Sequence, residues 1–202
     1  MLTLHHAPQS RSSVVVWLLE ELGVDYKINY CTIRRQDGSG GWDASNPHPD
    51  GKVPALVHDG ALVTEMAAVV LYLTDLLPGA ELGPQAGEAD RGAYLTWLAW
   101  YAGELQPALM ARFQAAAETG EQAEAAFAAA IARVVGALDR GPYLMGERFT
   151  AADVLIGSTL GWARQFAPPS AALDAWLARI ADRPAAKRAA EKDGAIEVVQ
   201  GV

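Results

Sequence analysis

Two short stretches carry the residue types that could bind and activate a small polar molecule. In the first, Val53-Pro54 precedes a hairpin signal and Thr64-Glu65 follows it, directly before an apolar stretch that predicts a helix. The free amides at a helix N-terminus can hold a carboxylate, and an acidic side chain beside them can hold an amine. This pattern is typical of a site for an amino-acid-like ligand.

The second stretch is the polar tetrapeptide from Ser10 to Ser13, which stands before the apolar helix expected over residues 14–22. Serine is a favoured N-cap residue, so Ser10 can be interpreted as a plain helix cap or as a hydroxyl that serves a ligand. Ser12 and Ser13 compete for either role, because a shift of one or two residues in this turn would exchange their places.

The elements that position these stretches form a β-α-β, loop, β-β-α order. Alternation and turn signals predict strands over 2–6, 26–32, 55–58 and 61–64, and helices over 14–22 and 65–77. Gly23 is expected to end the first helix, and Asp59-Gly60 predicts a two-residue type I′ hairpin. Pro54 has no N–H for a ladder and is a candidate for a cis peptide bond. This order predicts a thioredoxin-like domain over residues 1–80.

The second half of the chain shows helix signals only. After a Pro- and Gly-rich linker at 78–87, helices are expected over 90–119 and 121–138. Thr150 and Asp153 form a capping box for a further helix that Pro168-Pro169 ends, and Ser170 caps the next one. The Arg183-Pro184 pair breaks that helix in turn. We therefore expect an all-helical domain over residues 88–202.

Composition excludes several function classes. The net charge of −8 argues against nucleic-acid binding, which needs clustered Lys and Arg. The sequence has no secretory leader pattern and no apolar run of membrane-spanning length, so we expect a cytoplasmic protein that does not enter a membrane. Cys31, the single cysteine, cannot form an intrachain disulfide and is interpreted as a packed side chain rather than a reactive thiol. The His residues lack metal-ligand spacing, so no metal site is expected.

Four segments together resemble the cytosolic glutathione transferase family, in its bacterial Ser-type form. They are SRSSVVVWLLEELGVDY, NPHPDGKVPAL, TEMAAVVLYLTD and GERFTAADVLIG, in the right order over nearly all of the chain. The resemblance implies a thioredoxin-like domain that binds glutathione, a helical domain that forms the electrophile pocket, and a homodimer. It also implies a role in detoxification, with glutathione as co-substrate and no cofactor.

The resemblance assigns roles to particular residues. Ser10 would donate its hydroxyl proton to the glutathione sulfur. A free thiol has a pKa of about 8.5, which a helix N-terminus and a neutral hydroxyl donor both lower, and Arg11 would add positive charge. Val53 would pair with the cysteinyl main chain, and Pro54 would be the cis proline. Further glutathione contacts would come from Lys52, toward the glycine carboxylate, and from Glu65 and Met66, at the γ-glutamyl end.

The chain departs from the family pattern at Met66, where many members carry Ser. The amide at this position remains, but the hydroxyl that would grip the γ-glutamyl carboxylate is lost. This departure motivates one alternative function, a non-catalytic binding module of the same fold. A glutathione-dependent isomerase, lyase or peroxidase is the other. The first-helix turn holds no cysteine, which argues against a dithiol mechanism.

The second substrate should lie near the start of the long helix. Tyr101, Gln106 and Trp162 are the candidates, and an aromatic pocket there would suit small apolar or aromatic electrophiles. Trp97 and Tyr101 share a face at helical spacing, and Trp100 is expected to point elsewhere. These aromatic residues can equally be interpreted as helix or subunit contacts.

Overall fold

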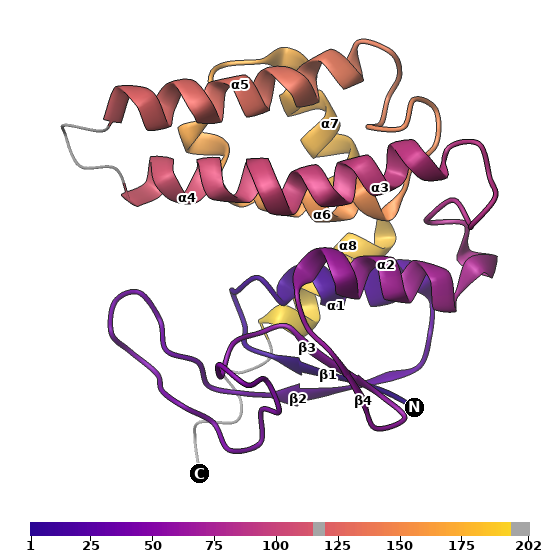
Figure 1. Cartoon of the computed structure of the whole chain (residues 1–202), viewed down its shortest axis with the longest axis vertical. Helices are drawn as coiled ribbons and strands as arrows, with labels where there is room; N and C mark the ends of the chain where they lie inside the picture. Colours follow the sequence, from indigo (N-terminus) through magenta and orange to yellow (C-terminus); the bar gives the residue numbers. More distant parts are fainter. Residues whose placement is uncertain (115–119, 195–202) are drawn as a thin grey trace. The chain divides into compact units, whose positions relative to one another are not determined.

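The computed structural model describes residues 1–114 and 120–194 (Figure 1). The chain divides into two compact units. The first comprises Met1–Ala80 together with the segment that begins at Arg183, and the second comprises Glu81–Asp182. Each unit is built around its own apolar core.

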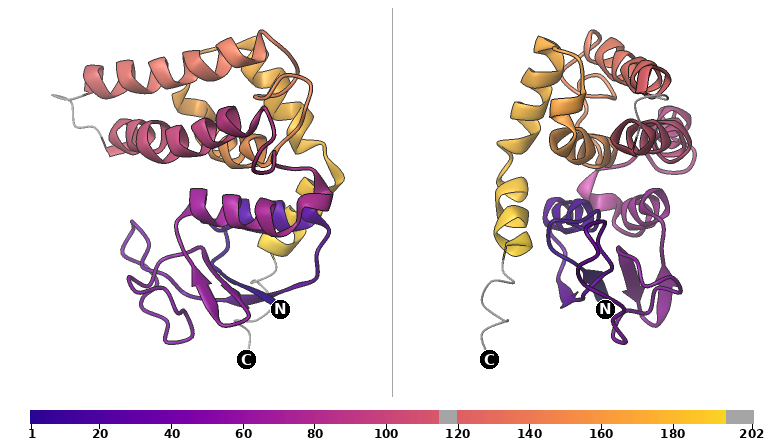
Figure 2. Two further views of the ribbon diagram at one scale, coloured as in Figure 1. Left: turned by 45° about the vertical axis from the view of Figure 1, so that its right-hand side comes forward. Right: turned by 90° about the vertical axis from the view of Figure 1, so that its left-hand side faces the viewer.

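The first unit is organised around a four-stranded sheet of order β2-β1-β3-β4. Its strands are β1 (Leu2–His6), β2 (Tyr26–Tyr30), β3 (Ala55–His58) and β4 (Ala61–Val63). The β1–β2 pair is parallel, and β3 runs antiparallel to both β1 and β4. Helices α1 (Ser13–Leu22) and α2 (Met66–Leu76) lie side by side over one face of the sheet (Figure 2). The predicted thioredoxin-like fold is confirmed.

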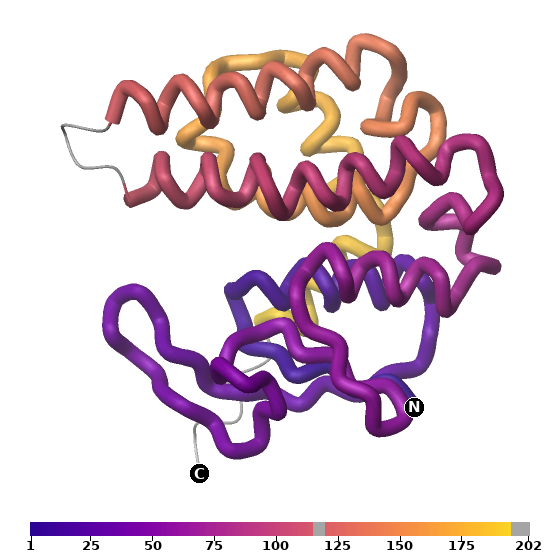
Figure 3. The backbone as a smooth tube through the Cα atoms, viewed as in Figure 1, coloured from indigo at the N-terminus to yellow at the C-terminus, as the bar shows by residue number. Residues whose placement is uncertain are grey.

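Turn chemistry fixes the ends of these elements as the sequence predicts. Gly23 adopts the left-handed conformation at the end of α1, with a φ of 63° that glycine accepts without steric cost. Asp59 and Gly60 both have positive φ, at 48° and 89°, which is the requirement of a type I′ hairpin. By contrast, residues 31–54 run as a long irregular loop between β2 and β3 (Figure 3).

The helix α8 (Pro184–Asp193) groups with the first unit, whereas the sequence analysis placed it in the helical domain. It packs along α1, on the side away from α2 (Figure 2). Charge explains the pairing, because acidic side chains of α1 meet basic side chains of the segment that begins at Arg183. The Arg188 guanidinium lies 2.8 Å from the Glu20 carboxylate, and Arg183 lies 2.7 Å from Glu21.

The second unit is helical. It holds α3 (Arg91–Trp100), α4 (Gln106–Gln114), α5 (Gly120–Leu138), α6 (Ala151–Trp162) and α7 (Ala171–Ala181). The single helix expected over 90–119 is wrong in one respect: a π-helical turn, Tyr101–Leu105, separates α3 from α4. Pro107 follows that turn and lacks the N–H of a regular helical bond, and its ring would crowd the carbonyl four residues earlier. Residues 115–119 of the expected helix lie outside the described residues.

Capping residues position α6 and α7. The Thr150–Asp153 capping box is present at the start of α6, and the Asp153 carboxylate accepts a hydrogen bond from the Thr150 amide at 2.9 Å. Ser170 caps α7 by accepting from the Leu173 amide at 3.3 Å. Both caps confirm the sequence interpretation. The expectation that Pro168-Pro169 ends the helix is wrong, because α6 already ends at Trp162 and a separate 3₁₀ turn, Arg164–Phe166, follows it.

Candidate functional site

The strand register places the two stretches that carry candidate ligand-binding residues at the same end of the sheet. His5 of β1 pairs with Ala55 of β3, and β3 in turn pairs antiparallel with β4. The segment that follows β1 therefore lies beside Val53-Pro54, which precedes β3. Continuation of the β3–β4 register places Glu65 on the same end. All the residues predicted to bind glutathione thus belong to one unit and follow or precede strands at the same end of its sheet.

The Val53–Pro54 peptide bond is cis, as predicted, and both residues are buried. The preceding loop is held by Asn46, whose side-chain amide donates to the Lys52 carbonyl at 2.9 Å. His48 is buried and accepts the Asp50 amide at 3.0 Å through Nδ1. Sequence reasoning missed Asn46, although Asn at the start of a Pro- and Gly-rich turn is a known turn signal.

The Lys52 side chain is exposed and forms an ion pair with Asp50 at 3.2 Å. An exposed pair of this kind contributes little to stability. The ammonium group can therefore exchange Asp50 for a ligand carboxylate at low cost.

Glu65 stands directly before α2 with a φ of 64°, a conformation that non-glycine residues rarely adopt. Such strain costs on the order of 1–3 kcal/mol and tends to occur where a residue serves a ligand. The Glu65 side chain is exposed, so its carboxylate is available. The Met66 side chain is buried instead, which leaves its amide, at the first position of α2, as the group that can face a ligand.

Ser10 lies in the turn between β1 and α1 and is partly exposed. Its Oγ accepts the Ser12 amide at 3.2 Å and donates to the Ala7 carbonyl at 2.6 Å. The N-cap of α1 is Ser12, so the interpretation of Ser10 as the helix cap is wrong. The Ser10 hydroxyl instead holds the turn before α1, and its role as a donor to a ligand stays a prediction.

The neighbouring side chains of the same turn differ in exposure. Ser12 is fully buried, with an exposed fraction of 0%. Ser13 donates its hydroxyl proton to the Asp193 carboxylate at 2.7 Å. Arg11 is exposed. Ser10 and Ser13 are both partly exposed, but the Ser13 proton is held by the Asp193 carboxylate, whereas the Ser10 proton goes to the neutral Ala7 carbonyl. Ser10 is therefore the serine whose proton a ligand can recruit at the lower cost.

A buried histidine and a carboxylate from α8 lie behind this turn, and sequence reasoning missed both. His6 ends β1 with an exposed fraction of 0%, and its Nδ1 lies 2.8 Å from Ser12 Oγ. Asp193 lies at the end of α8 and accepts the Gln9 amide at 3.2 Å. A histidine in the last position of an inward-facing strand, just before a polar helix start, is a local signal for such a contact. No local signal points to Asp193.

The second unit holds the three residues predicted to contact the electrophile. Tyr101 is buried in the π-helical turn, and its hydroxyl accepts from Thr159 of α6 at 3.2 Å. Gln106 begins α4 and is partly exposed. A π-helical turn is frequently found at functional sites. The geometry therefore places two of the three candidates at a helix irregularity.

Trp162, the third candidate, ends α6 and is 57% exposed. Its ring packs 5.6 Å from Phe113, and Phe113 packs 5.9 Å from Phe166. The Arg112 guanidinium lies over the Phe166 ring at 5.7 Å. These residues form an exposed aromatic cluster (Phe113, Trp162, Phe166), and sequence reasoning identified only one member.

The aromatic residues of α3 pack differently from the expectation. Trp97 and Trp100 are both buried and contact each other edge to face, with ring centroids 5.3 Å apart. The Arg133 guanidinium of α5 lies over both rings. The expectation that Trp100 points elsewhere is wrong, because residues three apart on a helix are neighbours.

Three further features of the described residues bear on function, namely the single cysteine, possible metal ligands and possible membrane-spanning helices. Cys31 is buried, and this burial raises the pKa of its thiol, as expected for a packed side chain. Across residues 1–114 and 120–194, no cluster of three His, Cys, Asp or Glu side chains could hold a metal ion. None of the helices that the structure describes is long and apolar enough to cross a membrane.

Comparison with known proteins agrees with this geometry. Residues 10–76 match the description "Glutathione S-transferase, N-terminal domain", and residues 114–188 match "Glutathione S-transferase, C-terminal domain". The chain is 29% identical to Glutathione S-transferase GstA of Escherichia coli O157:H7, over 87% of this chain and 90% of the relative. It is also 29% identical to the Disulfide-bond oxidoreductase YfcG of Escherichia coli K12, over 94% of each chain.

Among solved structures, the fold is similar to that of a sphingomonad glutathione S-transferase complexed with glutathione. The TM-score is 0.82 and the identity is 29%, over 96% of this chain and 99% of that one.

Proposed function

Because the chain belongs to the glutathione S-transferase family, we propose that it joins the thiol of bound glutathione to small electrophiles. The observation that carries this proposal is that three groups lie at one end of the sheet. They are the Ser10 hydroxyl, the cis Val53–Pro54 bond and Glu65 at the N-terminus of α2.

Glutathione would lie across this end of the sheet, between the turn after β1 and the start of α2. The backbone of Val53 would pair with the cysteinyl residue, and the Glu65 carboxylate would accept the γ-glutamyl amine. The Met66 amide would hold the γ-glutamyl carboxylate, and Lys52 would attract the carboxylate of the glycine residue. These contacts use every charged group of the tripeptide, and charge-assisted hydrogen bonds are the strong ones.

Ser10 would act as a donor to the sulfur rather than as a nucleophile. When glutathione binds, the Ser10 proton would leave the Ala7 carbonyl and turn to the thiolate. The lone pair that accepts the Ser12 amide can stay in place, so the turn before α1 keeps its shape. The N-terminus of α1 and the exposed Arg11 would add positive potential near the anion.

The electrophile would be apolar or aromatic. Tyr101, Gln106 and Trp162 are the residues proposed to contact it, and the exposed aromatic cluster around Trp162 supports this substrate class. We also infer a cytoplasmic homodimer that takes glutathione as co-substrate and needs no other cofactor.

A glutathione-dependent disulfide reaction is the second candidate, and the disulfide-bond oxidoreductase relative favours it. The protein supplies no reactive thiol for such a reaction, because Cys31 is buried and the pKa of its thiol is raised. Both sulfur atoms would then have to come from glutathione molecules or from the substrate.

Retention on immobilised glutathione, followed by rate measurements on chlorinated aromatic, epoxide, peroxide and disulfide substrates, tests these proposals. The leading function predicts retention and conjugation of chlorinated aromatic compounds or epoxides. Turnover of the disulfide substrate alone would establish the second candidate. Retention without turnover would indicate a binding module, and no retention would refute glutathione binding.

A further inference from the structure

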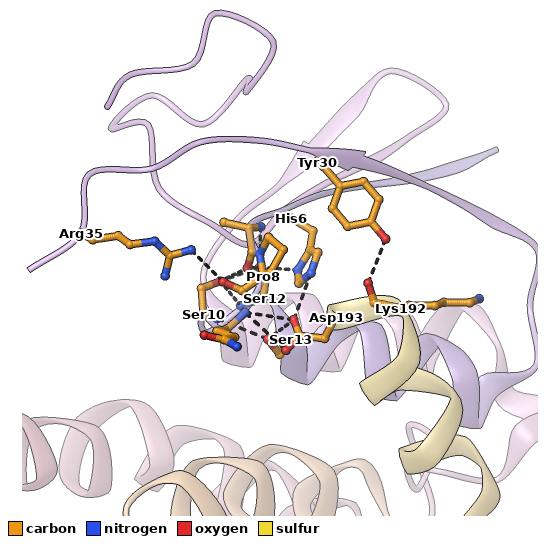
Figure 4. A network of polar contacts seen from close by, with 11 residues as sticks. His6, Pro8, Ser10, Ser12, Ser13, Tyr30, Arg35, Lys192 and Asp193 are labelled. Atoms are coloured by element: carbon orange, nitrogen blue, oxygen red, sulfur yellow. Dashed lines mark hydrogen bonds and ion pairs between the residues drawn. The ribbon is translucent and has the colours of Figure 1, made fainter. Parts of the chain in front are cut away.

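A continuous hydrogen-bonded chain leads from Ser10 into the interior of the first unit (Figure 4). Ser10 Oγ lies 2.8 Å from Ser12 Oγ, and Ser12 Oγ lies 2.8 Å from Nδ1 of His6. The Ala7 amide donates to Ser12 Oγ at 3.2 Å and holds that hydroxyl in place. Both Ser12 and His6 are fully buried, so bulk water does not compete for these contacts.

The far side of the histidine faces a carboxylate. His6 Nε2 lies 3.1 Å from Asp193 Oδ1, but no acceptor within the described part of the chain meets Nε2 at hydrogen-bond angles. The contact is therefore close and oblique. Burial tends to raise the pKa of Asp193, but the close His6 ring and the hydrogen bonds from Ser13 and Gln9 outweigh it and hold that pKa below its ordinary value. Asp193 is thus ionised at neutral pH.

The glutathione thiol has to lose a proton when it becomes a nucleophile. Resting on the function proposed above, we propose that His6 receives this proton through the hydroxyls of Ser10 and Ser12, and that Asp193 is a positioning residue that stabilises the resulting imidazolium. A Ser–Ser–His–Asp relay of this kind requires the distances seen here and a histidine that is shielded from bulk water, as His6 is with an exposed fraction of 0%.

The proton inventory balances in both states. When glutathione is bound, the Ser10 proton turns from the Ala7 carbonyl to Ser12 Oγ. Before transfer, the thiol then donates to Ser10, Ser10 donates to Ser12, and Ser12 donates to Nδ1 of neutral His6. The S–H bond then breaks as its proton passes to Ser10 Oγ. The Ser10 proton passes to Ser12 Oγ, and the Ser12 proton passes to Nδ1. Afterwards every hydrogen bond of the relay is reversed. His6 Nδ1 donates to Ser12, Ser12 donates to Ser10, and Ser10 donates to the thiolate.

Other polar groups around the relay are accounted for. The Tyr30 ring of β2 contacts the His6 ring edge to face at 5.6 Å, and the Tyr30 hydroxyl donates to the Lys192 carbonyl at 2.9 Å. The Arg35 guanidinium donates to the Pro8 carbonyl at 2.8 Å. Figure 4 shows these side chains around the turn, with Asp193 as the carboxylate directed at His6.

The direction in which Asp193→Asn changes the thiol pKa of bound glutathione distinguishes the relay from simple electrostatics. Asp193→Asn removes a negative charge near the thiolate, and Coulomb's law alone predicts a lower thiol pKa for bound glutathione. The relay predicts the opposite, because the imidazolium that forms with the thiolate loses its partner. We expect the thiol pKa to rise by about one unit, which lowers the thiolate fraction about tenfold at pH values below both pKa values and by less near neutrality.

The experiment is an ultraviolet titration of the glutathione thiolate bound to the full-length enzyme, with the pH profile of the rate beside it. Arg188→Gln is the matched control, since it removes another α8-to-α1 contact without touching the relay. We expect it to leave the thiol pKa unchanged, and we expect Asp193→Glu to recover part of the Asp193→Asn shift. A second readout needs no glutathione. Nitrogen NMR of the free wild-type protein should show that Nδ1 of His6 carries no proton and that Nε2 does.

Several outcomes would overturn the relay. They are a thiol pKa that falls or stays constant in Asp193→Asn, an equal rise in Arg188→Gln, or a neutral His6 that carries its proton on Nδ1. Absence of any bound thiolate in the wild type would instead refute the proposed function from which the relay starts. The two failures are therefore distinguishable.

Discussion

Replacement of Asp153 by Ala is expected to destabilise the second unit far more than loss of a helix cap would. The carboxylate is fully buried and collects four donors, which are the amides of Leu144 and Thr150, the Thr150 hydroxyl and the Trp176 indole. The distances are 2.9, 2.9, 3.2 and 3.1 Å, in that order. Asp153 therefore joins the cap of α6 to α7 and to the loop before α6.

The magnitude follows from the donors that would be left without an acceptor. A buried donor without a partner costs about 1–3 kcal/mol, and Asp153→Ala leaves three N–H groups in that state. Removal of the carboxylate also has a favourable part, because burial raises the pKa of Asp153 even though the four donors oppose that rise. We therefore expect a net loss of about 3–5 kcal/mol.

Thr150→Ala is the matched control, since it removes the hydroxyl and keeps the amide that Asp153 accepts. Its cost should be that of an ordinary cap, about 1 kcal/mol. Urea unfolding followed by tryptophan fluorescence measures both variants, and comparison of the midpoints at constant slope gives the difference. An Asp153→Ala variant no less stable than Thr150→Ala would refute the reasoning.

Two further predictions concern the first unit. Glu65→Gly should relieve the strained φ of 64° and stabilise the fold by about 1 kcal/mol, while glutathione affinity measured by calorimetry falls at least about tenfold. Glu65→Gln keeps the strain and should lose affinity alone, whereas equal affinity in both variants and the wild type would exclude the carboxylate from binding. Because burial raises the pKa of the Cys31 thiol, alkylation of the native protein should be much slower than alkylation in urea. Rapid native alkylation, or loss of conjugation activity in Cys31→Ala, would show that this thiol takes part in function.

The sequence predicts the local features of the fold well, because each depends on a few adjacent residues. Asp59-Gly60 predicts the hairpin since both positions need positive φ, and Gly23 predicts the end of α1 for the same reason. The Thr150 capping box needs only the spacing of two side chains. The cis Val53–Pro54 bond was expected from an X-Pro pair at the entry to a strand.

Features that depend on contacts between residues far apart in the chain could not be predicted from the sequence pattern. The packing of α8 on α1 joins segments more than a hundred residues apart, and the separation of 187 positions between His6 and Asp193 hides their contact. The π-helical turn before Pro107 also escaped prediction, since a proline near the start of a helix is ordinary. The strained backbone of Glu65 has no signal in the residue type.

The most direct test of the central claim is the pH dependence of kcat/KM for the electrophile, measured at saturating glutathione, for Ser10→Ala against the wild type. Loss of the hydroxyl that donates to the sulfur should raise the apparent pKa of the bound thiol by about one unit or more and move the rate profile to higher pH. The wild type should show a thiol pKa well below about 8.5, the value of a free thiol. A Ser10→Ala profile that coincides with that of the wild type would contradict the assignment of Ser10 as the donor to the glutathione sulfur.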